Sequence, residues 1–374
     1  MSKRHFEVAD RKARRLIVMT RMNLTKHAGA KAPADVRKVC MDMGFEAVDL
    51  PVVPDKRFNA TNLFRFLGGG GRLLLEALRL RASDVVLVQH PVVGRLENEA
   101  VPFVCRNARR ICLVHDVDFI RKPTNRNYDD IKFLRGFQVV IVHNQTMVEK
   151  LQPLLPDTIL ICLGIFDYIV AGDKAIASCS DKPECLYIIG NLHPMKAKYL
   201  YGLPALDVGV EAYGPNFDQA AAMPGVHWNG VLDMNNPALG LVRGFGLVWD
   251  GVAATGLQGE WGDYLKVNTP HKLSFYISLG IPVIIHREAA MAAFVSQHKI
   301  GFLTDSIMDA SAQVKSCTAS QWKSALAGVA LLRSQLQTGL YTKTAINSAL
   351  KALPEPHGVS NRTVPLKHTP SSLG

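Results

Sequence analysis

Short runs of Val, Ile and Leu alternate with amphipathic stretches of helical period along most of the chain, and this alternation constrains the fold more than any other feature. Such continuous apolar runs are typical of strands buried on both faces of a parallel sheet, whose crossover connections are helices. The sequence therefore predicts an α/β fold built on parallel sheets. Strands are expected at residues 15–19, 45–50, 84–89, 110–115, 138–143 and 158–163, and again at 185–190, 206–214, 246–250, 281–286 and 299–303.

The alternation pauses once, at residues 167–184, where Gly, Ser, Asp, Lys and Pro replace the apolar runs. A chain of 374 residues also exceeds what one hydrophobic core usually supports. We therefore predict two Rossmann-like domains that face each other across a cleft, at residues 1–168 and 169–353. The last helix is expected to pack back across the hinge. The tail at 354–374, rich in Pro, Ser and Thr, is expected to be disordered.

Composition narrows the class of protein. No apolar run is long enough to span a bilayer, and the N-terminus is charged where a signal peptide would be apolar, so we expect a cytoplasmic protein. The seven cysteines include no C-x-x-C pair and are expected to be reduced core residues. Apolar surface in the strand at 185–190 and in the late helices leaves self-association into a homo-oligomer open.

A formal net charge of +11 predicts an acidic partner. Nucleic acid is disfavoured, because aromatic residues make up only 7% of the chain and are dispersed, whereas nucleic-acid modules interleave them with a basic stripe. The densest basic cluster, "RKARR" at residues 11–15, is either a solvated arm or a contact with the anionic inner face of a membrane.

The stretch "WGDYLKVNTPHKLSFYISLGIPVII", residues 261–285, reads as a loop, a helix and a buried strand. Thr269 is predicted to be the N-cap, Pro270 suits the first helical position, and Gly280 is placed to end the helix before the strand. The sequence thus predicts a helix that starts near residue 270.

The first turn of this helix is unusual in charge. Helix N-termini favour Asp or Glu, yet this one offers His271 and Lys272, with Lys266 just upstream. Free backbone N–H groups together with these cations would suit an anion such as a diphosphate. The alternative is that Lys272 points into solvent and His271 packs on a neighbouring loop.

The segment "YLKVNTPHKLSFYISLGIPVIIHREAAMAAFV", followed by "IGFL", resembles the donor-binding segment of a GT-B family of bacterial sugar transferases. That family includes β-1,6-galactofuranosyltransferases and the glucosyltransferase that acts on streptococcal serine-rich adhesins. Further matches cover residues 15–345 in order: "HAGAKAPADV", "VVLVQHP", "LVHDVDFIR", "VVIVHNQTMVEKL", "LGIFDY" and "GNLHPMKAKYL". Thr269 and His90 depart from the Asn and Tyr that the family pattern has there.

The resemblance implies a GT-B fold, a UDP-sugar donor in the C-terminal domain, an acceptor in the N-terminal domain, no bound metal and no cofactor. It also implies that lysines neutralise the diphosphate from two sides of the pocket, while amide, hydroxyl and carboxylate groups order the turn or bind hydroxyls of the sugar and ribose. The donor-binding residues that it implies are Asn191, Lys198, Asp250, Lys266, Asn268, Thr269 and Lys272.

Sugar transfer to a hydroxyl needs a general base, and "HDVD" follows a buried strand of the N-terminal domain. Asp116 or His115 is the predicted base, with Arg121 as an orienting, acceptor-side partner. The alternative is that each merely bonds to a neighbouring loop. "DVD" also matches the D-x-D metal motif, a weak three-residue pattern that we do not favour. In the loop after the first strand, Gly29 and Lys31 are predicted to contact the acceptor, unless this is simply a flexible connection.

The sequence thus predicts an enzyme that moves a hexose, galactofuranose or glucose, from a UDP-sugar to a hydroxyl of a saccharide, lipid-linked saccharide or glycoprotein in cell-surface polysaccharide or glycoprotein assembly. Inversion is favoured because the Glu-x7-Glu pair of one large class of retaining enzymes is missing: Asn268 follows Glu260 and Ser296 follows Glu288 at that spacing. Two alternatives stay open. One is a nucleotide-binding scaffold for a partner transferase. The other is a dinucleotide-dependent oxidoreductase or epimerase, disfavoured because no G-x-G-x-x-G follows a strand.

Overall fold

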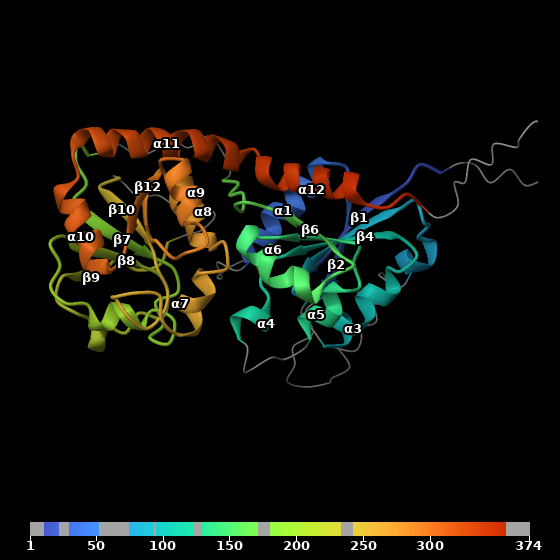
Figure 1. The fold of residues 1–374 in the computed structure, drawn as a ribbon, viewed down its shortest axis with the longest axis horizontal. Coiled ribbons are helices and arrows are strands. Elements are labelled where there is room, and N and C mark those ends of the chain that lie inside the picture. Colours follow the sequence, from blue (N-terminus) through green and yellow to red (C-terminus); the bar gives the residue numbers. More distant parts are fainter. Residues whose placement is uncertain are drawn as a thin grey trace, which may run out of the picture.

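A computed structural model of the chain describes residues 11–21, 30–51, 75–92, 95–122, 129–170, 180–232 and 242–356. It contains two six-stranded parallel sheets, each with helices packed around it (Figure 1). The predicted α/β fold with two Rossmann-like domains is therefore confirmed. None of the helices in the described residues is long and apolar enough to cross a membrane.

The first sheet has the strand order β2-β1-β3-β4-β5-β6. Its strands are β1 (Arg15–Arg21), β2 (Glu46–Pro51), β3 (Val85–His90), β4 (Arg109–Val114), β5 (Val139–Val142) and β6 (Ile159–Cys162). The helices of this domain are α1 (Lys31–Asp42), α3 (Arg95–Val104), α4 (Asp118–Arg121), α5 (Asp130–Leu134) and α6 (Gln145–Leu151), with a 3-10 turn at Gln152–Leu154.

The second sheet has the strand order β12-β11-β10-β7-β8-β9. Its strands are β7 (Cys185–Ile189), β8 (Gly209–Tyr213), β9 (Val226–Trp228), β10 (Gly244–Val248), β11 (Val283–His286) and β12 (Gly301–Thr304). The helices are α7 (Gly259–Leu265), α8 (His271–Ser278), α9 (Ala292–Gln297), α10 (Ile307–Ser316), α11 (Ala319–Gln337) and α12 (Leu340–Ala352), with 3-10 turns at Lys198–Gly202 and Gln219–Ala221.

Alternate strand residues serve two cores, one on each face of the first sheet. In β1, Leu16 and Val18 belong to one cluster and Ile17 to the other, and all three are almost fully buried. Each such side chain contributes about 1.5–3 kcal/mol when it is removed from water. Burial on both faces is the physical reason that these strands read as unbroken apolar runs.

The two C-terminal helices connect the domains. In Figure 1, α11 runs along the second domain and α12 lies over the first. A turn at Gly339, which has a φ of 72°, separates the two helices. Ala345, Ile346 and Ala349 of α12 pack in the same apolar cluster as Val36 of α1. The chain therefore completes one core of its first domain with its last helix.

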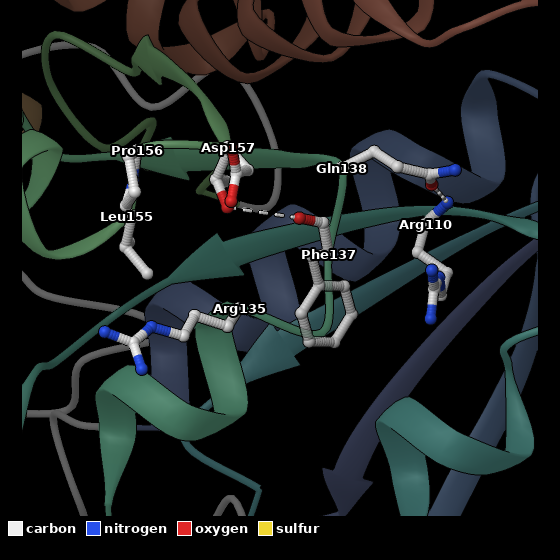
Figure 2. A pocket seen from close by; sticks show the side chains of 8 residues that line it. Arg110, Arg135, Phe137, Gln138, Leu155, Pro156 and Asp157 are labelled. Carbon is white, nitrogen blue, oxygen red and sulfur yellow. Dashed lines mark hydrogen bonds between the residues drawn. The ribbon is translucent and has the colours of Figure 1, made fainter.

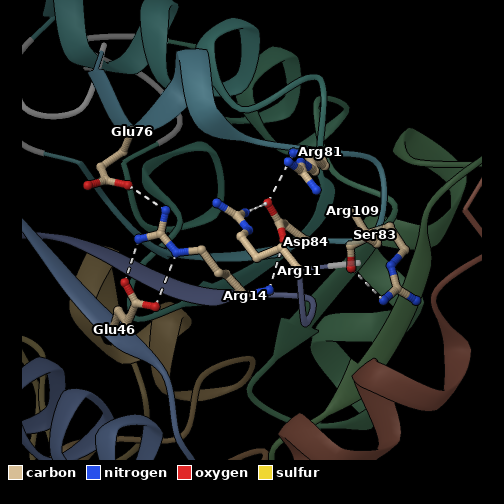
Figure 3. A network of polar contacts seen from close by, with 8 residues as sticks. All are labelled: Arg11, Arg14, Glu46, Glu76, Arg81, Ser83, Asp84 and Arg109. Atoms are coloured by element: carbon tan, nitrogen blue, oxygen red, sulfur yellow. Dashed lines mark hydrogen bonds and ion pairs between the residues drawn. The ribbon is translucent and has the colours of Figure 1, made fainter. Parts of the chain in front are cut away.

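The basic cluster at residues 11–15 is partly neutralised within the molecule (Figure 3). Arg11 lies 2.8 Å from Asp84, and Arg14 lies 2.8 Å from Glu76 and also pairs with Glu46. These ion pairs hold the segment just before β1 against the residues that precede β3 and against the start of β2. A free basic arm is thus the wrong description of Arg14, because three side-chain hydrogen bonds to two carboxylates hold its guanidinium group.

The prediction that the cysteines are reduced core residues is confirmed for five of them. The free thiols of Cys40, Cys105, Cys112, Cys185 and Cys317 are buried, as expected for core residues, but Cys162 is exposed at the end of β6, an edge strand. Cys179 and the tail at 357–374 lie outside the described residues.

Candidate active site

The carboxyl ends of both sheets carry the polar residues that the sequence singled out. In the second sheet the strand order reverses between β7 and β10, which is the position where open α/β sheets bind ligands. The segments after these two strands touch: the Gly251 N–H donates to the Lys196 carbonyl at 3.1 Å, and Ala197 bridges to Gly251. A side chain at Gly251 would collide with the Gln258 carbonyl, so glycine permits this close approach.

Thr269 ties the start of α8 to the end of β5. Its N–H donates to His143 Nδ1 at 3.0 Å, and its hydroxyl oxygen accepts from Asn144 Nδ2 at 3.1 Å. The predicted N-cap role is wrong, because α8 begins at His271 with Pro270 as N-cap and no side-chain capping bond. Thr269 is instead a buried link between the domains, 2% exposed. Gly280 does end the helix, with a φ of 78°.

Lys272 faces Asp250, the residue two positions after β10. Its ammonium nitrogen lies 2.8 Å from Asp250 Oδ1 and donates to the Trp249 carbonyl at 2.7 Å. Burial lowers the pKa of Lys272 from its usual value, and Asp250 opposes that shift. An ammonium group has three donors, so one remains for an incoming anion. The structure therefore brings together two predicted donor residues, Lys272 and Asp250. The Asp250 carboxylate already accepts a hydrogen bond from Lys272.

Lys196 is a candidate site residue that the sequence analysis missed. Its ammonium group lies 4.9 Å from the ring centroid of Trp261, and no carboxylate among the described residues pairs with it. Burial lowers the pKa of Lys272 and raises that of Asp116, and the charge of Lys196 adds to the first shift and opposes the second. The feature that could have identified Lys196 is its position in the loop after β7, at the topological switch point. The prediction chose Lys198, whose side chain is exposed two residues further on.

Two further predicted donor residues, Lys266 and Asn268, differ in whether their polar groups already have partners. Lys266 lies 3.4 Å from Asp263 and 3.5 Å from Glu288 at the surface, so carboxylates already balance its charge. Asn268 is different, because its Oδ1 atom is buried without a hydrogen-bond partner among the described residues. A buried acceptor without a partner is costly, and a ligand hydroxyl would satisfy it.

Asn191, at the surface after β7, stabilises its own loop. Its Oδ1 atom accepts from the His193 N–H and from Asn216 Nδ2, both at 3.0 Å. These bonds shape the loop that carries Lys196. A direct ligand contact by Asn191 stays a prediction.

His271 does not add to the positive charge of the α8 N-terminus. Its ring centroid lies 6.0 Å from that of Phe166 and 5.3 Å from that of Tyr168. Burial, with Lys31 nearby, lowers its pKa to about 3, so the ring is neutral at pH 7. Lys272 is then the cation of this helix turn.

Asp116 lies at the junction of the two domains. Arg121 Nη1 approaches its Oδ2 atom at 2.6 Å, and the hydroxyl of Tyr264, from the second domain, donates to its Oδ1 atom at 3.2 Å. Burial raises the pKa of the carboxyl, which is what a general base requires. The side chain is still 37% exposed, so an acceptor can reach it.

Both carboxylates of the D-x-D pattern are paired within the chain. Arg121 pairs with Asp118 as well as with Asp116, so one guanidinium group already compensates both carboxylates. Within the described residues, no group of three His, Cys, Asp or Glu side chains is arranged to hold a metal ion.

His115, the other predicted base, is held in one tautomer. Gln89 Nε2 donates to the Pro33 carbonyl, so its Oε1 atom faces His115 Nε2 at 2.7 Å and accepts a hydrogen bond from the His115 Nε2–H group. The bare Nδ1 atom is buried, and the ring stacks on Phe166 with centroids 5.5 Å apart. Burial lowers the pKa of His115 well below its usual value. His115 is therefore a weaker candidate base than Asp116.

The predicted acceptor residues of the loop after β1 find little support. Lys31 is 8% exposed, pairs with Asp35, donates to the Ile169 carbonyl at 2.7 Å and lies over the Tyr168 ring. Its ammonium group is thus used to anchor the segment that leaves the first domain, which argues against an acceptor contact. Gly29 lies outside the described residues.

A separate hollow lies on the first domain (Figure 2). Its lining comes from the amino ends of β4, β5 and β6, opposite the edge at which α/β sheets bind ligands. We therefore assign it no part in the site. The lining residues are Arg110, Arg135, Phe137, Gln138, Leu155, Pro156, Asp157 and Thr158.

Comparison with known proteins agrees with this geometry. The profile of the N-terminal domain of glucosyltransferase 3-like proteins matches residues 16–153, and that of the C-terminal domain matches residues 186–349. The chain is 27% identical to the β-1,6-galactofuranosyltransferase WbbI of Escherichia coli (strain K12) over 336 residues, which covers 88% of this chain and 96% of that protein. It is 24% identical to glucosyltransferase 3 of Streptococcus gordonii over 330 residues, 85% of this chain and 93% of that one.

A solved structure shares the fold. The lipopolysaccharide outer core galactosyltransferase WaaB, in its apo form, superimposes with a TM-score of 0.51 at 12% identity, covering 90% of this chain and 99% of that one. Two family domains in this order span most of the chain, each on one of the two Rossmann-like sheets. The protein therefore belongs to the glucosyltransferase 3-like family of GT-B glycosyltransferases.

Proposed function

We propose that the protein transfers a hexose from a UDP-sugar to a hydroxyl of a saccharide, lipid-linked saccharide or glycoprotein, with inversion and without a metal ion. One observation carries this proposal: cations and a candidate base face the same domain junction from opposite domains. Lys196 and Lys272 lie on the second domain, and Asp116 lies on the first. Lys196 and Arg121, the partner of Asp116, lie over the same Trp261 ring, 4.9 Å and 5.9 Å from its centroid.

The donor diphosphate is proposed to lie at the N-terminus of α8. No side chain among the described residues caps the first turn of α8, the third donor of Lys272 is available, and Lys196 pairs with no carboxylate among the described residues. Asn268 Oδ1 would accept a hydrogen bond from a hydroxyl of the ribose or sugar. Because UDP leaves as an anion, charge placed where the new negative charge develops lowers the barrier, and this takes over the part that a metal would play.

The reaction proposed is a single displacement. Asp116 takes the proton of the acceptor hydroxyl, the oxygen forms a bond to the anomeric carbon, and the bond to the diphosphate breaks with its electron pair going to UDP. One displacement inverts the anomeric centre. The missing Glu-x7-Glu pair, with Asn268 and Ser296 at the second positions, supports this stereochemistry.

The donor sugar is proposed to be galactofuranose or glucose, because the two relatives reported above are named for a galactofuranosyl and a glucosyl transfer. The test incubates purified protein and EDTA with UDP-galactofuranose, UDP-glucose or UDP-galactose and a panel of saccharide acceptors, and measures release of UDP and the anomeric configuration of the product. Transfer from one donor that Asp116→Asn abolishes supports the proposal. Nucleotide binding without transfer under all conditions would favour a scaffold for a partner transferase.

A further inference from the structure

The carboxylate of Asp116 is held by a group from the other domain. Tyr264 lies on α7, and the residue is 4% exposed. Its hydroxyl accepts from the Val117 N–H at 3.4 Å and donates to Asp116 Oδ1 at 3.2 Å. A backbone donor, a hydroxyl and a carboxylate thus form one chain across the junction.

The direction of this chain is fixed by chemistry. The Val117 N–H can only donate, so the Tyr264 oxygen receives that bond and its own proton turns toward the carboxylate. Burial raises the pKa of the phenol well above its usual value, which keeps this proton on Tyr264. Arg121 holds the other carboxylate oxygen. With one oxygen bound from each domain, the carboxylate plane is fixed, and its remaining lone pairs are free for an acceptor hydroxyl.

We propose that Tyr264 is a positioning residue, which holds the Asp116 carboxylate in its reactive orientation while the two domains are in contact. This inference rests on the proposed function, since it concerns the base of that reaction. Because the hydroxyl belongs to the donor domain, separation of the domains would release one side of the carboxylate. The base is then aligned only when the donor domain is in place.

The charged groups around Asp116 define what a pH measurement would report. Arg121 and Lys196 favour the ionised carboxylate, Asp118 disfavours it, and the Tyr264 hydrogen bond favours it. Loss of the Tyr264 hydroxyl removes one favourable interaction and leaves the three charges unchanged. The pKa of Asp116 should therefore rise.

The test compares Tyr264→Phe with wild type and with Tyr187→Phe. Tyr187 is a matched control, because its hydroxyl also accepts from a backbone N–H, that of Arg243 at 3.2 Å, while its ring packs near Tyr213, away from the site. For Tyr264→Phe we expect kcat to fall by about tenfold to a hundredfold with an unchanged KM for the donor. The acidic limb of the pH dependence of kcat should move to higher pH. Tyr187→Phe should show neither change.

Several outcomes would overturn the proposal. One is a wild-type kcat and acidic limb in Tyr264→Phe, and another is an equal change in Tyr187→Phe. If Tyr264→Phe behaves like wild type while Asp116→Asn abolishes transfer, the positioning role fails and the proposed function stands. If wild type transfers no sugar, the proposed function fails, and the Asp116 pKa is followed instead by carboxyl ¹³C NMR, with the signal assigned from Asp116→Asn. An equal pKa in wild type and Tyr264→Phe then refutes the contact.

Discussion

Lys272 of α8 and Asp250, which follows β10, form an ion pair with Nζ 2.8 Å from Oδ1, and both side chains are mostly buried. The pair fixes the first turn of α8 against the end of β10, at the switch point of the second sheet. It also holds the ammonium group where the helix N-terminus would meet an anion. One contact therefore serves stability and the proposed donor site together.

Replacing Lys272 should affect both properties. Lys272→Ala leaves the Asp250 carboxylate without its cation, and we expect a loss of about 3 kcal/mol in the free energy of unfolding, measured by urea denaturation. Lys272→Met combined with Asp250→Asn removes both charges and should recover most of this stability but not UDP affinity. Full UDP affinity in the double variant would contradict the phosphate role of Lys272.

Lys196 should affect binding alone. Because no carboxylate among the described residues pairs with it, Lys196→Ala should leave the free energy of unfolding nearly unchanged. UDP affinity, measured by calorimetry, should fall about tenfold to a hundredfold, as expected for loss of one charge-assisted hydrogen bond. Lys198→Ala is the matched control, two residues away and exposed. A larger effect from Lys198→Ala would return the role to the residue predicted from the sequence.

Asp116 should matter for turnover and not for nucleotide binding. Asp116→Asn keeps the shape of the side chain and removes the base, so kcat should fall about 10²- to 10⁴-fold while UDP affinity stays near wild type. His115→Gln should have a smaller effect on kcat, since its ring is buried and its bond to Gln89 is only orienting. The reverse order of the two effects would make His115 the base.

Low pH should reduce the free energy of unfolding, because His143 is buried at the domain junction. Burial lowers the pKa of His143 to about 4, below the value of about 6.5 in an unfolded chain. The unfolded state therefore binds more protons between these values, and His143 should cost about 1.4 kcal/mol of stability for each pH unit below 6.5.

Asp167 acts in the opposite sense, because burial raises its pKa to about 6 and its contribution is lost as pH rises. The measurement is therefore the difference between wild type and His143→Gln in urea denaturation at pH 7, 6 and 5. That difference should shrink or reverse as the pH falls. His227→Gln, at an exposed position of β9, should track wild type, and a parallel course for His143→Gln would refute the assignment.

Much of the fold follows from local sequence. Strands such as β7 (Cys185–Ile189) and β11 (Val283–His286) are buried on both faces and therefore appear as apolar runs. The helix predicted at 319–337 matches α11, whose Thr318 and Gln321 form a capping box. The sequence analysis missed β9 (Val226–Trp228), because an edge strand of three residues, two of them exposed, leaves no apolar run.

The site was harder to predict, because it depends on which strands become neighbours. Nothing local places Lys196 beside the residues after β10. Lys196 differs from Lys198 in its contact with the Trp261 ring, whereas Lys198 is exposed. Likewise the contact of Asp116 with Tyr264 joins residues 148 positions apart. Thr269 looked like a helix cap, but its hydroxyl is used between domains.

The most direct test of the account is calorimetric titration of the full chain with UDP, UMP and uridine in excess EDTA. We predict that UDP binds at one site per chain and much more tightly than UMP, because the second phosphate meets Lys196, Lys272 and the α8 N-terminus. Equal affinities for UDP and UMP, or UDP binding that appears only when Mn²⁺ or Mg²⁺ replaces EDTA, would contradict a metal-free diphosphate site at this junction.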